Sequence, residues 1–318
     1  MLKGLIANLP MAWSVIALIV LFIILGVAAD KVIDRVKSLS VKLGLPVFIL
    51  GFILGILTSF PEMAVAISSI NNKALDLSMG NLLGGTIVIL SLMLGLSVLI
   101  NRSIDNDGEY GFLALALAYM LIPAILALKG GLGMLDGLII IALFVLLMWR
   151  LYQGSSRSVK FRLTSLKESK AMKELLIVIV GMIVVVVTAD AIVELTLNAL
   201  SSYSVSPYLI GLIFFPIGTN LPELTVAFAS FKKKAGELSF SNLLSSALFN
   251  SLILGIVAFT QTVKLEVTGP HLVTLLTMLV LFSLVLIFYK SGKRLSRWEG
   301  AILILVYLIF IILQTGFL

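Results

Sequence analysis

The chain has 318 residues, of which 60% are hydrophobic and 12% are charged, and its formal net charge is +7. A soluble domain has about 45–50% apolar and about 25% charged residues, so this composition excludes soluble enzymes and disordered proteins. The chain has no cysteine and a single histidine, His271, which excludes disulfides, thiolate metal sites and multi-histidine clusters. These totals predict an integral membrane protein.

Ten hydrophobic segments, taken in chain order, are long enough to cross a bilayer, which requires about 20 mostly apolar residues. They cover residues 11–29, 43–70, 75–100, 110–128, 133–151, 174–199, 206–230, 238–260, 271–289 and 298–316. Each run is continuous rather than alternating, which favours helices over the strands of a membrane barrel. The first run is longer than the core of a signal peptide, which has about 7–15 residues, so we interpret it as a mature helix. We therefore predict an all-α, multi-pass membrane protein with ten transmembrane helices.

The basic residues gather in alternate loops. The odd-numbered loops between the predicted helices hold 19 of the 23 lysine and arginine residues, and the other side of the membrane holds Lys3, Lys73, Lys129 and Lys264. Cytoplasmic loops are the basic ones, so we expect both termini to lie on the extracytoplasmic side of a cell membrane. The positive charge therefore reports orientation in a lipid bilayer, and we expect no nucleic-acid partner.

The sequence contains an internal repeat. The segment from Asp30 to Glu62 matches the segment from Asp190 to Glu223, with one residue inserted in the second copy. Each copy holds five predicted helices, and an odd number of helices inverts the second copy relative to the first. Inverted repeats are typical of secondary transporters, whose substrate site lies near the membrane midplane. We predict a first five-helix repeat over residues 1–151, a basic cytoplasmic linker over 152–173 and a second, inverted repeat over 174–318.

Two carboxylates lie deep inside predicted helices. Glu62 and Glu223 are far from either end of their hydrophobic segments, and each directly follows a proline. A carboxylate at that depth is costly and is usually functional. Each proline frees the carbonyl of the residue four positions earlier, here Leu57 or Gly218, and kinks its helix. An all-oxygen site with two negative charges suits Ca²⁺, which takes six to eight oxygen ligands. The alternative is a structural pair, with each glutamate bonded to a neighbouring hydroxyl.

The remaining ionisable residues are interpreted as structural. Asp30 and Asp190 lie near predicted helix ends, where we expect them at the membrane interface, and we expect the same of His271. Asp136 lies near a helix start, where a carboxylate complements the helix dipole.

The motifs around both glutamates resemble those of a known family. The chain carries TSFPE at 58–62 and GTNLPE at 218–223, and these are followed by GNLLGG at 80–85 and SNLLSS at 241–246. They are similar to the paired alpha-repeat signatures of the calcium:cation antiporter superfamily, and the resemblance covers nearly the whole chain. It implies a sodium/calcium exchanger-like fold, with Glu62 and Glu223 as central calcium ligands and Thr58 and Thr219 as further oxygen donors.

The sequence departs from the family pattern in the second element of each repeat. The usual GSN serine and asparagine are replaced by Gly85 and Thr86 in the first repeat, and the asparagine is replaced by Ala247 in the second. Four residues after that serine, where sodium exchangers of the family carry Asn or Asp, the chain has Ile89 and Asn250. The resemblance therefore implies weakened sodium coordination.

We therefore expect a secondary antiporter, not an enzyme, that exchanges Ca²⁺ for a monovalent cation by alternating access and needs no cofactor. Protons are the favoured counter-ion, because two carboxylates that lose Ca²⁺ in a poorly solvated cavity can be neutralised by H⁺ without further ligands. A Na⁺/Ca²⁺ exchanger of the same fold is the alternative, and a cation channel is a more remote one.

We expect a monomer in the lipid bilayer. The predicted ion ligands are Glu62, Glu223, Thr58, Thr219, Ser59, Asn220, Asn250 and Ser246.

Overall fold

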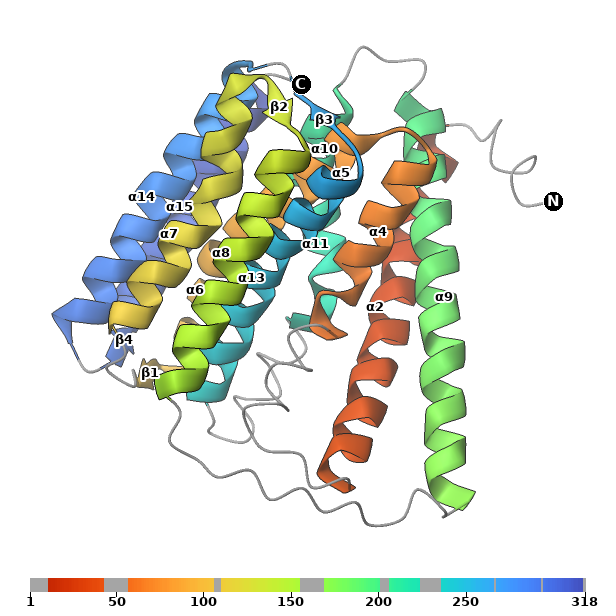
Figure 1. Ribbon diagram of the computed structural model, residues 1–318, viewed down its shortest axis with the longest axis horizontal. Helices are drawn as coiled ribbons and strands as arrows, with labels where there is room; N and C mark the ends of the chain where they lie inside the picture. The colour runs from red at the N-terminus through yellow and green to blue at the C-terminus, as the bar shows by residue number, and fades with distance from the viewer. Residues whose placement is uncertain are drawn as a thin grey trace.

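The structure is a computed structural model that describes residues 11–42, 57–105, 110–154, 169–200, 206–223, 236–265, 267–292 and 294–316. Figure 1 shows a bundle of helices. The α-helices are α2 (Met11–Lys42), α4 (Phe60–Asn71), α5 (Leu75–Val88), α6 (Leu94–Asn101), α7 (Tyr110–Leu126), α8 (Met134–Gly154), α9 (Ser169–Leu200), α10 (Pro207–Ile213), α11 (Phe215–Thr219), α13 (Gly236–Thr260), α14 (Gly269–Ser291) and α15 (Arg297–Thr315). A π-helix, η1 (Ile89–Met93), joins α5 to α6, and a 3-10 helix, η2 (Ala127–Lys129), follows α7.

Eight of the described helical segments are long and apolar enough to cross a membrane. These eight fall on eight of the ten predicted segments, and the structure therefore agrees with a multi-pass membrane protein. The other two predicted segments, 43–70 and 206–230, are broken helices that lie partly outside the described residues. The count of ten transmembrane helices thus stays a prediction.

In the described part of the chain, four short strands form two antiparallel ribbons at opposite ends of the bundle (Figure 1). Strand β1 (Ser103–Asp105) pairs with β4 (Arg294–Ser296), and β2 (Gly131–Leu132) pairs with β3 (Val263–Lys264). The sequence predicts no strands here, because segments of two or three residues in loops show no hydrophobic alternation. Each ribbon joins a loop of the first half of the chain to a loop of the second half.

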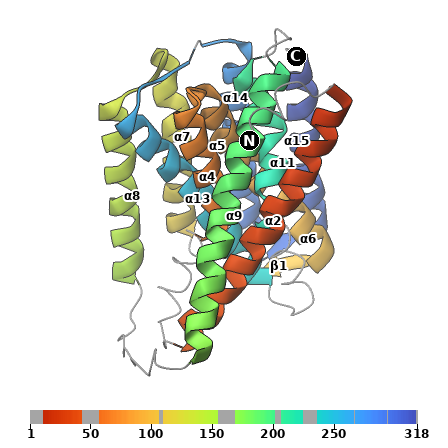
Figure 2. The ribbon, with the colours of Figure 1, turned by 90° about the vertical axis from the view of Figure 1, so that its right-hand side faces the viewer.

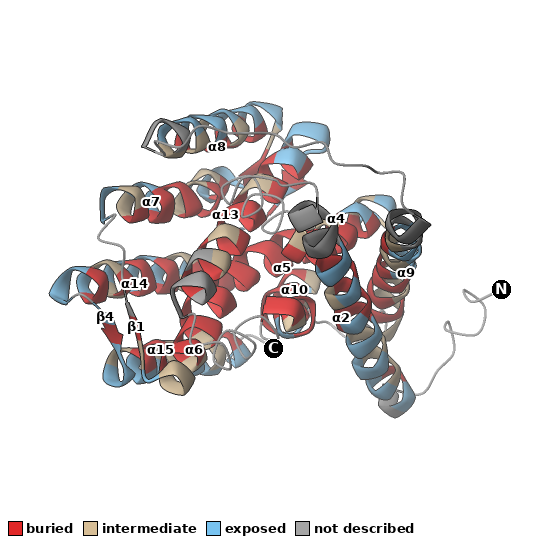
Figure 3. Ribbon diagram, turned by 90° about the horizontal axis from the view of Figure 1, so that it is seen from below, coloured by how far each residue is buried: buried red, intermediate tan, exposed pale blue. Residues whose placement is uncertain are grey.

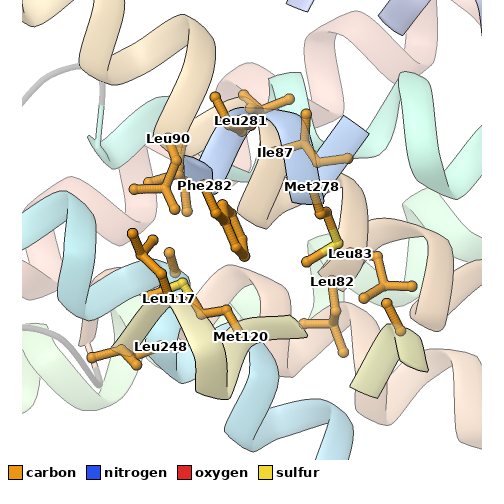
Figure 4. Close-up of a cluster of buried hydrophobic side chains, with 14 of the residues drawn as sticks. Leu82, Leu83, Ile87, Leu90, Leu117, Met120, Leu248, Met278, Leu281 and Phe282 are labelled. Atoms are coloured by element: carbon orange, nitrogen blue, oxygen red, sulfur yellow. The ribbon is translucent and has the colours of Figure 1, made fainter. Parts of the chain in front are cut away.

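Buried apolar side chains form two hydrophobic clusters. The larger cluster joins α5, η1, α6, α7, α8, α10, α13, α14 and α15. Figure 4 shows part of it, where Leu82 and Leu83 of α5 face Met278 of α14, and Met120 of α7 lies near Phe282. The smaller cluster joins α2, α4 and α9 to a few residues of α5 and α11. Figure 2 shows α2 and α9 together on one face, so this pair packs largely apart from the main bundle.

Glycines let the two broken-helix regions approach the centre of the bundle. A Cβ atom on Gly80 or Gly84 of α5 would lie 2.2 Å from a backbone oxygen of α10, and one on Gly211 of α10 would lie 2.2 Å from the Leu77 oxygen. Small residues of this kind allow helix backbones to pack closely in a membrane. Figure 3 shows the result: α5, α10 and α13 lie in the buried middle, and exposed residues line the outer helices.

Three expectations about polar residues can be compared with the structure. Helix α2 continues to Lys42 and α9 to Leu200, so Asp30 and Asp190 lie within long helices rather than at their ends. His271, in the first turn of α14, is 0% exposed and bonds through Nε2 to the Ala124 oxygen at 3.1 Å, so its ring is buried within the protein, and its place at the membrane interface stays a prediction. Asp136 has the predicted structural role, because its Oδ2 accepts the Gly133 N–H at 2.8 Å at the start of α8.

Candidate functional site

Two breaks in the helical backbone lie at equivalent positions of the repeat. In the first half, a helical turn ends at Ser59, and α4 begins with Phe60 and Pro61. In the second half, α11 ends at Thr219, and Asn220 stands at the break. The backbone angles nearly coincide, with φ −86° and ψ 11° at Ser59 and φ −89° and ψ 18° at Asn220. This bridge region of φ/ψ space is sparsely populated and is common in functional sites.

The predicted kinks are therefore confirmed, although one detail differs. The Gly218 carbonyl, which we expected to be free, is approached by the backbone N–H of Asn220, which also donates to the Pro216 oxygen. The turn at Asn220 is closed further by its own side chain, whose Nδ2 donates to the Pro216 oxygen at 2.8 Å. The break in the second repeat is thus held by local hydrogen bonds.

Each break places a carboxylate in the interior of the protein. Glu62 and Glu223 are 1% and 0% exposed. Their negative charges lie close enough to repel each other, and none of their four oxygens has a hydrogen-bond partner at standard geometry, although the Thr219 and Ser246 hydroxyls lie beside them. An uncompensated buried charge is strongly destabilising. The pair therefore needs a bound cation or protons to balance it.

Threonine hydroxyl groups of each repeat form hydrogen bonds with side chains of the other half of the chain. Thr58 Oγ1 lies 2.8 Å from Ser246 Oγ of α13, and the Thr219 hydroxyl donates to Asn81 Oδ1 of α5 at 3.3 Å. The Thr219 side chain also lies near the Glu62 carboxylate, and Ser246 lies near Glu223. The polar side chains of both halves therefore surround one common site.

Asparagine side chains add further oxygens. Asn220 and Asn250 are both 0% exposed, and their Oδ1 atoms have no hydrogen-bond partner. The Nδ2 atom of Asn250 lies 2.6 Å from where a Cβ atom of Gly85 would stand, and Asn220 Nδ2 lies 3.5 Å from the same point. Both amides therefore occupy the space that the absent side chain of residue 85 leaves open.

The structure brings the eight predicted ion ligands together. Among these eight residues, six buried oxygens have no hydrogen-bond partner, two from each carboxylate and one each from Asn220 and Asn250. The hydroxyl groups of Thr58, Thr219 and Ser246 lie beside them, and Ser59 Oγ donates to the Ser246 oxygen at 3.5 Å. Ca²⁺ takes six to eight oxygens at flexible geometry, so this donor set fits a calcium ion chemically.

One residue of the site was missed at the sequence level. Asn81 accepts the Thr219 hydroxyl and is 0% exposed, and its Nδ2 has no partner. The signal was present in the sequence, because Asn81 and Asn242 are equivalent positions of the repeat. An asparagine retained in both copies of a buried helix points to a polar surrounding.

Ile89 and Thr86, in contrast, stay outside the donor set. Ile89 is 0% exposed and packs in the larger hydrophobic cluster. The Thr86 hydroxyl donates to the Leu82 oxygen of its own helix at 3.0 Å. The first repeat therefore supplies fewer donors from α5 than the second repeat supplies from α13.

The fold and the site together define a multi-pass membrane protein with a buried cluster of oxygen donors, two carboxylates among them, between two broken helices. A family model described as sodium/calcium exchanger protein matches the chain over residues 13–153 and 173–316. The chain therefore belongs to the sodium/calcium exchanger family, within the calcium:cation antiporter superfamily, as its motifs predicted.

Several curated proteins are similar to this chain along most of their length. The uncharacterized membrane protein MJ0091 of Methanocaldococcus jannaschii is 25% identical over 83% of this chain and 85% of its own length. The inner membrane protein YrbG of Escherichia coli is 24% identical over 90% and 92%. The putative antiporter CaxA of Alkalimonas amylolytica is 23% identical over 91% and 96%.

Two kinds of solved structure share the fold. A structure of the sodium-calcium exchanger NCX_Mj, soaked with Na⁺ and Sr²⁺, has a TM-score of 0.66 at 23% identity and covers 95% of this chain and 99% of its own. The H⁺/Ca²⁺ exchanger CAX has a TM-score of 0.76 at 15% identity and covers 96% and 85%. At these identities, the likeness shows the fold and leaves the transported ions to be argued from the site.

Proposed function

We propose that this protein is a secondary active antiporter that exchanges Ca²⁺ for a monovalent cation across the cell membrane. The observation that carries the proposal is the buried pair Glu62 and Glu223, whose four oxygens have no ion-pair partner and no hydrogen bond of standard geometry among the described residues. Two negative charges match one Ca²⁺, and the asparagine oxygens and hydroxyls beside them complete a ligand number that suits this ion. The relatives named as exchangers and antiporters support the same reading.

We propose further that the chain is built from two inverted five-helix repeats. The stretches that the family model matches coincide with the proposed repeats, 1–151 and 174–318, on either side of the linker 152–173. The equivalent breaks at Ser59 and Asn220 and the two ribbons at opposite ends of the bundle also support this arrangement. With ten helices and a basic cytoplasmic linker, both termini lie on the extracytoplasmic side.

For the counter-ion, we propose H⁺ in preference to Na⁺. Gly85 and Ile89 offer no side-chain oxygen where the second repeat has Ser246 and Asn250. Protons need no such ligands, because they bind directly to the two carboxylates once Ca²⁺ leaves. Sodium exchange remains the alternative, since structures of this fold include both a sodium-calcium exchanger and an H⁺/Ca²⁺ exchanger.

The test is ⁴⁵Ca²⁺ uptake into proteoliposomes that contain the purified protein. Uptake is measured under an imposed outward H⁺ gradient without Na⁺, and separately under an outward Na⁺ gradient at equal pH with a protonophore. We expect saturable, trans-stimulated uptake under the H⁺ gradient. Uptake driven by Na⁺ alone would overturn the choice of counter-ion, and fast uncoupled current would overturn the antiporter in favour of a channel.

A further inference from the structure

A second polar contact between the two halves of the chain lies outside the ion site. Asp190 of α9 accepts the Ser68 hydroxyl of α4 at 2.7 Å, and it also accepts Asn72 Nδ2 at 3.3 Å. Asn72 Nδ2 donates to the Ser68 oxygen at 3.0 Å as well. The three residues, Asp190, Ser68 and Asn72, therefore form one connected group, which we call the α4–α9 clamp.

The clamp holds the end of the helix that carries Glu62. Helix α4 has 12 residues, which is about the length at which an isolated helix is marginal, so its position depends on its neighbours. At its start, Ser59 makes no side-chain cap, and its Oγ donates instead to the Ser246 oxygen of α13 at 3.5 Å. At its end, Asn72 caps the helix, with its backbone N–H donating to the Ser68 oxygen. The clamp is therefore the polar contact that holds the far end of α4 against α9.

The clamp also lies within the smaller hydrophobic cluster. That cluster includes Ala64 and Val65 of α4 together with Ala189 and Val193 of α9, and the two helices contact each other. Apolar contacts of this kind are non-directional, whereas a hydrogen bond to a carboxylate fixes one register. The clamp therefore selects the rotation and height at which α4 meets α9.

Both copies of the repeat carry the aspartate. Asp30 of α2 is equivalent to Asp190, and its negative charge acts on Glu223, the ion-site carboxylate of the opposite repeat. Asp30 of α2 therefore lies near the broken helix of the second half, as Asp190 of α9 lies beside that of the first half. Retention of the same residue in both copies argues against an incidental surface contact.

We propose that Asp190 is a positioning residue, which fixes α4 through Ser68 and Asn72 so that the Glu62 carboxylate is held at the ion site. This inference rests on the proposed function, because it assumes that Glu62 binds the transported Ca²⁺. Asp190 itself does not contact the ion.

The test compares three variants in ⁴⁵Ca²⁺ exchange and in direct Ca²⁺ binding by calorimetry. Asp190→Ala removes the acceptor, and we expect the half-saturating Ca²⁺ concentration to rise by about tenfold, which is what one hydrogen bond to a charged group is worth. Asp190→Asn keeps an oxygen that accepts the Ser68 hydroxyl, so this variant should bind Ca²⁺ within about twofold of the wild type. The control is Asp34→Asn, which changes an exposed aspartate of α2 and should leave binding unaltered.

A double-mutant cycle completes the test. Ser68→Ala should weaken Ca²⁺ binding as Asp190→Ala does, and the double variant should be no weaker than either single one, since both remove the same contact. The proposal would be overturned if Asp190→Ala bound Ca²⁺ with wild-type affinity. It would also be overturned if Asp190→Asn lost as much Ca²⁺ affinity as Asp190→Ala, because the charge of Asp190 would then matter and not its hydrogen bond. The Glu62→Gln variant distinguishes failure of this inference from failure of the proposed function. If Ca²⁺ transport survives in Glu62→Gln, the proposed function is wrong. If Glu62→Gln abolishes transport but Asp190→Ala binds Ca²⁺ normally, only the role of Asp190 is wrong.

Discussion

Glu62 and Glu223 are the residues on which the site depends, because together they supply its two negative charges. Glu62→Gln or Glu223→Gln removes one of these charges and keeps the shape of the side chain. In a low-dielectric site, the attraction of a divalent ion falls steeply with each lost charge. We expect Ca²⁺ exchange to fall by on the order of a hundredfold in either variant, equivalent to about 2.7 kcal/mol, as measured by ⁴⁵Ca²⁺ uptake.

Expression and monodispersity of these two variants should match those of the wild type, since each introduces a neutral isostere. If either variant keeps rapid exchange while the protein is correctly inserted, the corresponding glutamate is not an ion ligand. The two variants are informative separately, because the site draws one carboxylate from each half of the chain.

Gly85 offers a test of ion selectivity at the same scale. A side chain at this position would displace the Asn250 amide, whose Nδ2 lies 2.6 Å from the ideal Cβ. Gly85→Ser adds a hydroxyl equivalent to that of Ser246, whereas Gly85→Ala displaces the amide without adding an oxygen. We expect Gly85→Ser to raise Na⁺-driven Ca²⁺ uptake roughly fivefold above that of Gly85→Ala, the effect of one additional polar contact. Equal uptake in both variants would show that the missing oxygen does not limit Na⁺.

The site residues were predictable because a proline or a carboxylate inside a hydrophobic run destabilises a membrane helix, so its presence there indicates a function. Pro61 and Pro222 located both breaks, and the structure places Ser59 and Asn220 in nearly the same backbone conformation. The contact between Asn250 and Gly85 was not predictable, since it joins helices of opposite repeats. For the same reason, the hydrogen bond from Ser68 to Asp190 was not predictable.

At the scale of helices, the apolar runs predicted membrane spans more reliably than helix ends. Helix α2 was expected to end at residue 29, but it continues to Lys42. Charged residues such as Lys31 and Arg35 end the apolar run, yet they do not break a helix, because they have good helix propensity and can reach the interface. The end of a span and the end of a helix are therefore different boundaries in this chain.

Helix α10 depends on a glycine contact that can be tested. A Cβ atom on Gly211 would lie 2.2 Å from the Leu77 backbone oxygen, which cannot move aside without shifting α5. Gly211→Val should lower the free energy of unfolding by about 1–3 kcal/mol or prevent folding, as overpacking does. Thermal midpoints in detergent, followed by size-exclusion fluorescence, measure the change.

A matched control exists on α7. Gly111 has no heavy atom within 4 Å of its ideal Cβ position, so Gly111→Val adds the same atoms to open space. This variant should keep the wild-type thermal midpoint. If Gly211→Val is equally stable, the close approach of α5 and α10 does not contribute to stability.

For the whole molecule, the two ribbons connect the repeat to its orientation in the membrane. The β1–β4 ribbon and the β2–β3 ribbon lie at opposite ends of the bundle (Figure 1). Under the proposed topology, the loops that contain β1 and β4 are odd-numbered and face the cytoplasm. The loops that contain β2 and β3 are even-numbered and face outward.

Single cysteines test this orientation directly, because the chain has none of its own. Arg294 of β4 and Gln261, which lies just before β3, are both exposed. We expect Arg294→Cys to react with a membrane-impermeant thiol reagent from the cytoplasmic side alone, and Gln261→Cys from the outer side alone. Whole cells and inverted vesicles provide the two directions, and permeabilised vesicles provide the control for total reactivity. Labelling of both cysteines from the same side would contradict the arrangement of the two ribbons at opposite ends of the bundle. If Arg294→Cys reacted only from outside and Gln261→Cys only from the cytoplasm, the fold would be correct, but the orientation inferred from the basic loops would be wrong.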